Sequence, residues 1–192
     1  NVAIEYRWAE GQYDQLPALV ADLVQRQVNV IAATSTPAAL AAKAATTVIP
    51  IVFTTAGDPV QLGLVTSLGR PGGNITGATQ MNVEVAPKRL ELLHEVLPTA
   101  TNVGLLTNPT NPHAETVWKA VEAAARVVGI KLHVLHASHE RDFATAFANL
   151  AQVRAEALVI SPDNVFNSRS EDLAALTVRH RMPAIYQYPE FI

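Results

Sequence analysis

The residues of this chain that could hold a ligand collect at four short polar junctions, each of which follows an apolar run. Every junction combines hydroxyl, amide or carboxylate side chains with a proline, and the four read Ala-Thr-Ser-Thr-Pro at 33–37, Thr-Thr-Ala-Gly-Asp-Pro at 54–59, Thr-Asn-Pro-Thr-Asn-Pro at 107–112 and Ser-Pro-Asp-Asn at 161–164. In three of them a capping residue precedes a proline, which predicts a helix start whose free N–H groups favour an anion such as a carboxylate.

Helix capping is the simpler explanation of any one junction, because Ser, Thr, Asp and Asn are the preferred capping residues. A cap uses one side chain per helix, whereas Thr34, Ser35 and Thr36 together, and Thr54 with Thr55, supply more hydroxyls than capping requires. The surplus favours a binding role. The candidate ligand-binding residues are Thr34, Ser35, Thr36, Thr54, Thr55, Asp58, Gln80, Asn108, Asn111, Asp163 and Tyr186.

A ligand that carries an ammonium group as well as an acid needs a buried carboxylate, because an unpaired charge is costly to remove from water. Asp58 and Asp163 are the candidates for this role, and capping of the next helix is the alternative for Asp163. Tyr186 and Tyr188 could stack on an apolar or aromatic part of the ligand, with a place in the core as the alternative.

No pattern for catalysis, cofactor binding or metal binding accompanies these junctions. The tract at 132–139 holds three histidines, but His133 and His136 would point to opposite faces of a strand. The Gly-rich segment at 69–74 lacks the Lys and Ser/Thr of a phosphate loop, and the chain has no Gly-x-Ser-x-Gly, no His-Glu-x-x-His and no Gly-x-Gly-x-x-Gly after a strand. We therefore expect a binding protein that is not an enzyme and uses neither cofactor nor metal.

Short β-rich runs alternate with helical patterns along the chain, which is typical of βαβ units and a parallel sheet. Strands are expected at 2–6, 28–33, 48–54, 74–79, 102–106, 131–136, 157–160 and 184–186. Apolar residues at helical spacing predict the intervening helices, with core faces formed by Leu16, Leu19, Val20, Leu23 and Val24; Leu40, Ala41 and Ala44; Leu90, Leu93 and Leu97; Val117, Val121, Ala124, Ala125 and Val128; and Phe143, Ala146, Phe147 and Leu150.

Punctuating residues predict several helix ends. Asn111 and Pro112 are assigned to the start of the fourth helix and Gly129 to its end, and Asp142 is assigned to the cap of the fifth. The charged residues Lys88, Arg89, Glu91 and Glu95 are interpreted as the solvated face of the third helix.

The turn at 69–74 and the polar stretch at 80–84 mark a change of domain. The expected fold class is α/β, with two doubly wound, Rossmann-like parallel-sheet lobes and a ligand crevice between them. The N-terminal lobe is assigned to 1–81, the C-terminal lobe to 82–186 and the start of a hinge return to 187–192. The four polar junctions are expected to face the same crevice.

Composition excludes several classes of protein. With 192 residues, 49% of them hydrophobic, the chain can bury a substantial core. The 14 basic and 17 acidic residues give a net charge of -3 without any basic run, so nucleic acid is not an expected partner. No apolar stretch approaches the length of a membrane span. The lack of cysteine excludes disulfides and thiolate chemistry and is compatible with the cytoplasm or the periplasm.

Several separate blocks follow one another along the chain: 1–8 with Glu-Gly-Gln at 10–12, then 38–45, 50–59, Arg-Pro-Gly-Gly-Asn-Ile-Thr-Gly at 70–77, Lys-Arg-Leu-Glu-Leu-Leu at 88–93 and Ile-Ser-Pro-Asp at 160–163. In this order the blocks resemble the ABC-importer substrate-binding family of type I periplasmic fold. The resemblance implies a protein that acts outside the cytoplasm. It would capture an amino acid, often an aromatic one, or a similar carboxylate, for a membrane permease. A ligand-sensing effector domain of a regulator with the same fold is the alternative.

The resemblance also implies roles for individual residues. Ser35 and Thr36 would hold the acid end of the solute; Thr54, Thr55 and Asp58 would line the wall; and Asn108, Asp163 and Tyr186 would close the site from the second lobe. Family members begin with a signal peptide, a first strand and a first helix, and they end with further crossings between the lobes. The resemblance therefore implies that both ends of the protein are missing here. The unpaired sheet edges this leaves suggest a homodimer formed by swapping or edge pairing.

Overall fold

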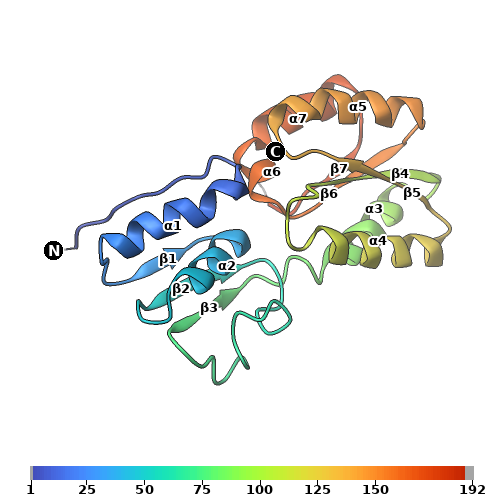
Figure 1. The fold of residues 1–192 in the computed structure, drawn as a ribbon. Helices are drawn as coiled ribbons and strands as arrows, with labels where there is room; N and C mark the ends of the chain where they lie inside the picture. The colour runs from blue at the N-terminus through green and yellow to red at the C-terminus, as the bar shows by residue number, and fades with distance from the viewer. Residues whose placement is uncertain (1, 189–192) are drawn as a thin grey trace. The chain divides into compact units, whose positions relative to one another are not determined.

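The computed structural model of the chain describes residues 2–188. The polypeptide forms two compact units, Asn1–Met81 and Asn82–Ile192, which we call unit 1 and unit 2 and describe separately (Figure 1). Both units are built from parallel strands joined by helices, so the α/β class predicted from the alternating patterns is confirmed. Of the expected hinge return at 187–192, residues 189–192 lie outside the described part of the chain.

Unit 1 contains a parallel sheet of three strands in the order β1-β2-β3. Its elements in chain order are the 3-10 helix η1 (Tyr13–Gln15), α1 (Leu16–Gln25), β1 (Ile31–Ala33), α2 (Thr36–Ala45), β2 (Ile51–Thr55) and β3 (Ile75–Thr79). Ile51 of β2 is in register with Ile31 of β1 and with Ile75 of β3. The carboxyl ends of the three strands therefore lie at one edge of the sheet.

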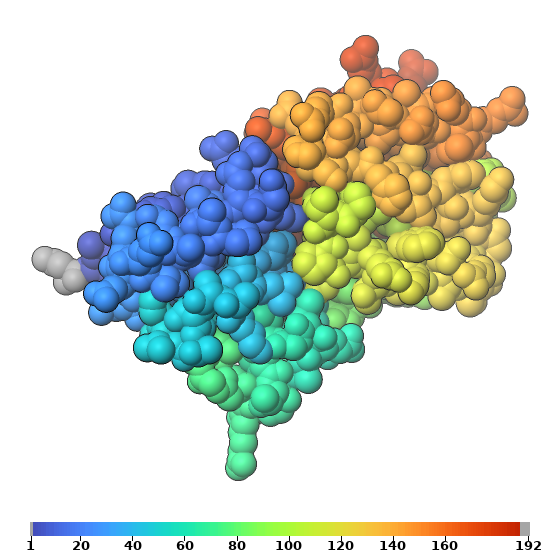
Figure 2. All heavy atoms as spheres, viewed as in Figure 1, coloured from blue at the N-terminus to red at the C-terminus, as the bar shows by residue number. Residues whose placement is uncertain are grey.

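The core of unit 1 lies between the sheet and the pair of helices α1 and α2. Ile31, Ile51, Phe53 and Ile75 are buried on this face, whereas the residues between them in β1 and β2 are exposed. The outer side of α1, blue in Figure 2, forms part of the surface of the unit.

Helix α2 turns a different face to the core from the one predicted. Ala39 and Ala42 are fully buried, while Leu40 and Ala41 are half-buried and Ala44 is exposed. The prediction followed the largest apolar side chain of the helix. The small side chains of the alanines instead let the backbone of α2 approach the sheet closely, which leaves Leu40 at the margin of the contact.

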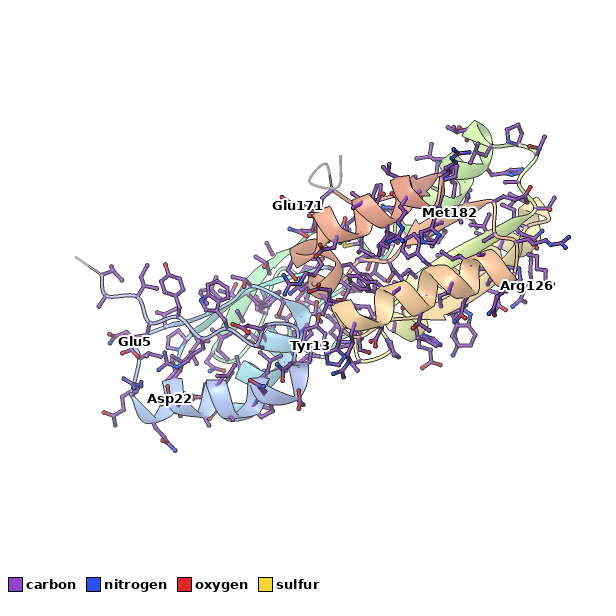
Figure 3. The ribbon with its side chains drawn as sticks, turned by 90° about the horizontal axis from the view of Figure 1, so that it is seen from above. Glu5, Tyr13, Asp22, Arg126, Glu171 and Met182 are labelled. Atoms are coloured by element: carbon purple, nitrogen blue, oxygen red, sulfur yellow. The ribbon has the colours of Figure 1, made fainter. Side chains whose placement is uncertain are left out.

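Residues 2–8 form no strand, so the prediction of a strand at 2–6 is wrong. The segment runs beside α1, where Arg7 donates to Asp22 and Glu5 forms an ion pair with Arg26 at 3.3 Å; Glu5 and Asp22 are labelled in Figure 3. Tyr6 and Trp8 stack with ring centroids 5.7 Å apart. The apolar alternation matched a strand, but side-chain ion pairs hold this segment, and a strand requires backbone partners.

Unit 2 contains a parallel sheet of four strands in the order β5-β4-β6-β7. Its elements are α3 (Ala86–Val96), β4 (Asn102–Thr107), α4 (Ala114–Val128), β5 (Lys131–His136), the 3-10 helix η2 (Glu140–Asp142), α5 (Phe143–Gln152), β6 (Ala157–Ile160), α6 (Asn164–Ser168), α7 (Ser170–Arg179) and β7 (Ala184–Ile185). Helices α3 and α4 cover one face of the sheet, and α5 and α7 cover the other (Figure 1).

Because helices cover both faces of the sheet in unit 2, its central strands are buried on both sides and are almost wholly apolar. All four residues of β6 are buried, as are residues 103–107 of β4. The predicted core face of α5 is confirmed, because Phe143, Ala146, Phe147 and Leu150 are each at most 2% exposed. Gly129 ends α4 in the left-handed conformation, as predicted.

The cap that was assigned to Asp142 takes another form. Its Oδ2 accepts hydrogen bonds from the backbone N–H groups of Ser138 and His139, both at 2.9 Å, and these bonds lower the pKa of Asp142. Asp142 directly precedes α5, but its side chain holds the preceding 3-10 turn. None of the described helices is long and apolar enough to cross a membrane.

We expect Gly77→Ala to lower the free energy of unfolding by about 1–3 kcal/mol, as overpacking typically does. A Cβ at this position would lie 2.2 Å from the carbonyl oxygen of Phe53 and 2.6 Å from its ring, so β2 and β3 would be forced apart. Urea unfolding followed by circular dichroism would measure the change.

Gly69→Ala is the matched control, because a Cβ on Gly69 would meet nothing within 4 Å. This variant reports the effect of the substitution on the unfolded chain alone, which is mildly stabilising. Equal stability of the two variants would contradict the close approach of β2 and β3 at Gly77.

Candidate functional site

The first group of candidate residues lies at the carboxyl ends of β1 and β2 in unit 1. Ser35 is the N-cap of α2, and its Oγ accepts a hydrogen bond from the N–H of Ala38 at 3.3 Å. Thr36 begins the helix, is 4% exposed and accepts from the N–H of Ala56 at 3.4 Å. The capping interpretation thus holds for Ser35, and Thr36 connects α2 to the loop that follows β2.

Two threonines of unit 1 share one acceptor. The hydroxyls of Thr55 and Thr79 both donate to the carbonyl oxygen of Gly57, at 2.9 and 2.8 Å. The N–H of Gln80 donates to the carbonyl of Thr55 at 2.9 Å, while the rest of Gln80 is exposed. The ends of β2 and β3 are therefore tied to the loop at 56–58.

The remaining candidates of unit 1 are placed differently from the prediction. Asp58 accepts from the N–H of Val60 at 2.8 Å and caps a turn, because residues 59–66 form no helix. Thr54 is exposed and points to the opposite side of β2 from the buried Thr55. Thr34 is exposed as well. The structure brings Thr36 and Thr55 to the same loop, but it does not bring Thr54 to them.

The second group lies at the carboxyl ends of β4 and β6 in unit 2 and centres on Asp163. Its Oδ2 accepts hydrogen bonds from the side-chain amides of Asn111 at 2.7 Å and Asn108 at 3.2 Å. Its Oδ1 accepts from the N–H of Val165 at 2.7 Å, which makes Asp163 the N-cap of α6. Asn108 is 0% exposed and Asp163 is 3% exposed, so two predicted residues from distant parts of the sequence meet in the interior.

The two asparagines have fixed amide orientations. Oδ1 of Asn108 accepts from the N–H and the hydroxyl of Thr110, at 3.0 and 2.7 Å. Oδ1 of Asn111 accepts from the N–H of His113 at 2.8 Å. Asn111 therefore holds a turn that precedes α4 and is not the helix cap, because α4 begins at Ala114 with His113 at its N-cap position.

Two buried groups beside this cluster were not identified from the sequence. Thr107 is 2% exposed, and its hydroxyl has no hydrogen-bond partner within the described residues. His113 is 5% exposed; burial lowers its pKa, and the charge of Glu84 acts in the opposite direction. The position of Thr107 as the last residue of β4, directly before Asn108, is the signal that could have identified it.

Tyr186 and Tyr188 have their hydroxyls in hydrogen bonds within unit 2. The hydroxyls of Tyr186 and Thr177 lie 2.9 Å apart, and the side-chain amide of Asn82 donates to the hydroxyl of Tyr188 at 2.8 Å. Both tyrosine residues are half-buried. These contacts favour the structural alternative for the hydroxyls, while stacking of a ring on a ligand stays a prediction.

The interpretation of Arg89 as part of a solvated helix face is wrong. Arg89 is 8% exposed, and its guanidinium donates to the carbonyl and the side-chain oxygen of Asn82, at 3.0 and 3.2 Å. Burial lowers its pKa, and Tyr188 opposes this effect. Lys88 is exposed, as predicted, and it pairs with Glu91 at 2.9 Å. The arginine thus fixes the first residue of unit 2 to α3.

The histidine tract has no metal-binding arrangement. Nε2 of His133 lies 3.2 Å from Oδ1 of Asn102. In the described part of the chain, no group of three or more His, Cys, Asp or Glu residues could hold a metal ion.

We expect Arg89→Ala to lower the free energy of unfolding by about 2–3 kcal/mol, because hydrogen bonds to a charged group are worth about 1.5–3 kcal/mol and two buried oxygens of Asn82 would lose their donor. Lys88→Ala, at the neighbouring exposed position of the same helix, should change it by less than about 1 kcal/mol. Guanidinium unfolding monitored by tryptophan fluorescence would compare the two, and similar losses would show that Arg89 has no special role.

Residues 1–192 match the family model described as ABC transporter substrate binding protein. The chain belongs to this family, and the resemblance inferred from the sequence blocks is confirmed.

Particular relatives are longer than this chain. The tyrosine-binding protein of Clostridioides difficile is 26% identical over 186 residues, which are 96% of this chain and 53% of the relative. A conserved domain protein from Vibrio cholerae has a TM-score of 0.88 at 27% identity, over 100% of this chain and 64% of that chain. The ABC domain from Streptococcus pneumoniae in complex with L-Trp has a TM-score of 0.86 at 21% identity, over 100% of this chain and 65% of that chain. The chain therefore spans about half to two thirds of these proteins.

Proposed function

We propose that this chain is a solute-capturing part of an ABC import system and that it binds its solute without converting it. The observation that carries the proposal is the match of the substrate-binding family over residues 1–192. The polar groups at the carboxyl ends of parallel strands in both units support it, because open parallel sheets bind ligands at that edge.

The proposed solute is an aromatic amino acid or a related aromatic carboxylate. The Clostridioides difficile relative is named for tyrosine, and the Streptococcus pneumoniae structure contains L-Trp. A solute-binding protein from Rhodopseudomonas palustris, similar in fold at 17% identity with a TM-score of 0.64, contains 3,4-dihydroxybenzoic acid. All three compounds combine a carboxylate with an aromatic ring.

Both units contribute residues to the proposal. Ser35 and Thr36, at the N-terminus of α2, are the proposed contacts for the acid end of the solute, because a helix N-terminus favours negative charge. Thr55, Asp58 and Gln80 are the further proposed residues from unit 1, and Thr54 is left out because it lies on the opposite side of β2. From unit 2 the proposed site residues are Asn108, Asn111 and Tyr186, together with Asp163, to which both asparagine amides donate.

The proposed partner is the membrane permease of an ABC importer, and the proposed location is outside the cytoplasm, where members of the family act. Pairing of two copies along the edge strand β1 is a further part of the hypothesis. A monomeric mass in light scattering would reject the pairing and leave solute capture unaffected.

A thermal-shift screen tests solute capture. We expect L-tyrosine, L-tryptophan or benzoate at about 100 times its dissociation constant to stabilise the protein by about 2.7 kcal/mol, since a ligand that binds only the folded state adds RT ln(1 + [L]/Kd). L-Lysine is the control, and mass spectrometry should recover the ligand unchanged. The absence of a shift with every aromatic carboxylate, or the release of a product, would contradict the proposal.

Two substitutions of Ser35 separate capping from ligand binding. Ser35→Ala removes both the cap and the hydroxyl, whereas Ser35→Gly removes the hydroxyl and retains most of the capping free energy. If Ser35 contacts the solute, we expect both variants to bind at least about tenfold more weakly in isothermal titration calorimetry, equivalent to about 1.4 kcal/mol. Unchanged affinity of the glycine variant would mean that Ser35 only caps α2.

A further inference from the structure

The carboxylate of Asp163 has most of its hydrogen-bonding capacity occupied by this chain. An ionised carboxylate offers about four acceptor positions and no donor. Asn111, Asn108 and the N–H of Val165 take three of these positions, and the residue is 3% exposed. A solute ammonium group would therefore meet a carboxylate that is buried and already bonded.

The partners of Asp163 cannot exchange their roles. The amide oxygens of Asn108 and Asn111 are held by Thr110 and His113, so each amide directs its N–H₂ group at Asp163. A rotated amide would lose its own bonds and place an oxygen against the carboxylate. The position thus requires a side chain that accepts hydrogen bonds through both of its outer atoms, a requirement that aspartate meets and asparagine does not.

The segment that these bonds hold is the turn between β4 and α4. Asn108 is fully buried at its start, whereas Pro109, Thr110 and Pro112 are exposed and Asn111 is half-buried. The amide of Asn111 also donates to the carbonyl of Pro162 at 3.3 Å, which attaches the turn to the junction after β6. The groups that a solute can reach therefore belong to the turn, whereas the Asp163 carboxylate that orients the turn is buried.

We infer that Asp163 is a positioning residue, which acts on the solute by orienting Asn111 and the exposed turn between β4 and α4, and is not the counter-ion of a solute ammonium group. This inference rests on the proposed function. The affinity for an aromatic carboxylate without an amino group should then depend on Asp163 as much as the affinity for an amino acid does.

Two probes that differ only in the ammonium group test this role. Isothermal titration calorimetry would measure the dissociation constants of L-tyrosine and 3-(4-hydroxyphenyl)propionate for the wild type and for Asp163→Asn. Asparagine retains an oxygen for the cap on Val165 but turns an N–H₂ group toward the two asparagine amides. We expect both constants to rise at least about tenfold and by the same factor.

A loss confined to L-tyrosine, with the affinity for the analogue unchanged or improved, would overturn the inference and make Asp163 the ammonium partner. Asp172→Asn, which removes an exposed carboxylate on α7, is the matched control and should change neither constant. Far-UV circular dichroism of each variant verifies that it is folded.

If the wild type binds only one of the two probes, the affinity for that probe is measured in a double-mutant cycle of Asp163 and Asn111, which tests the positioning role. Positioning through Asn111 requires that Asp163→Asn and Asn111→Ala together cost little more affinity than either alone, whereas additive losses would overturn the inference.

If the wild type binds neither probe, the side-chain amide signals of Asn108 and Asn111 in ¹⁵N spectra decide the positioning role, while the thermal-shift screen decides the proposed function separately. These signals should show slow exchange with solvent that Asp163→Asn abolishes. Signals that do not respond to the substitution would contradict the role of Asp163 even without a ligand.

Discussion

Parallel pairing of every strand is the constraint on which the rest of this structure depends. Neighbouring parallel strands cannot be joined by a tight turn, so each must return through a crossover that packs on the sheet. The carboxyl ends of all strands in a sheet then lie along one edge. In unit 1 the junctions after β1 and β2 meet at such an edge, and in unit 2 the junctions after β4 and β6 do. Segments more than 50 residues apart thereby come within hydrogen-bonding distance, as Asn108 and Asp163 do.

Burial decides how the polar side chains at these edges are used. A polar group removed from water must find a partner in the protein, because a missing hydrogen bond costs more than a formed one contributes. Thr55 and Thr79 share the carbonyl of Gly57, and Asp163 collects two amides and a backbone N–H. Much of the polarity at the junctions therefore shapes the loops themselves. The exposed parts of those loops are what a solute can reach.

The same principle explains the placement of Arg89 and Asn82. A buried guanidinium needs acceptors, and the backbone and side-chain oxygens of Asn82 provide them at the point where unit 2 begins. Asn82 in turn donates to Tyr188, so residues from the beginning and the end of unit 2 are joined. The position of the chain next to α3 is thus specified by polar contacts as well as by the apolar packing of Leu90 and Leu93.

The sequence by itself determined the α/β class, seven of the eight predicted strands, and the buried faces of α4 and α5 with Val117 and Phe143, because these depend on local periodicity. It also determined the family, because the motifs of the family are contiguous in the chain. Only the tertiary structure decided that 2–6 is no strand, that Ala39 and Ala42 face the core in place of Leu40, and that Arg89 is buried. It also decided the partners of Asp163, since Asn108 and Val165 become neighbours only when β4 and β6 pair. Spacing along a sequence states which side chains share a face, but the donors and acceptors that they meet belong to distant segments, and folding alone brings those segments together.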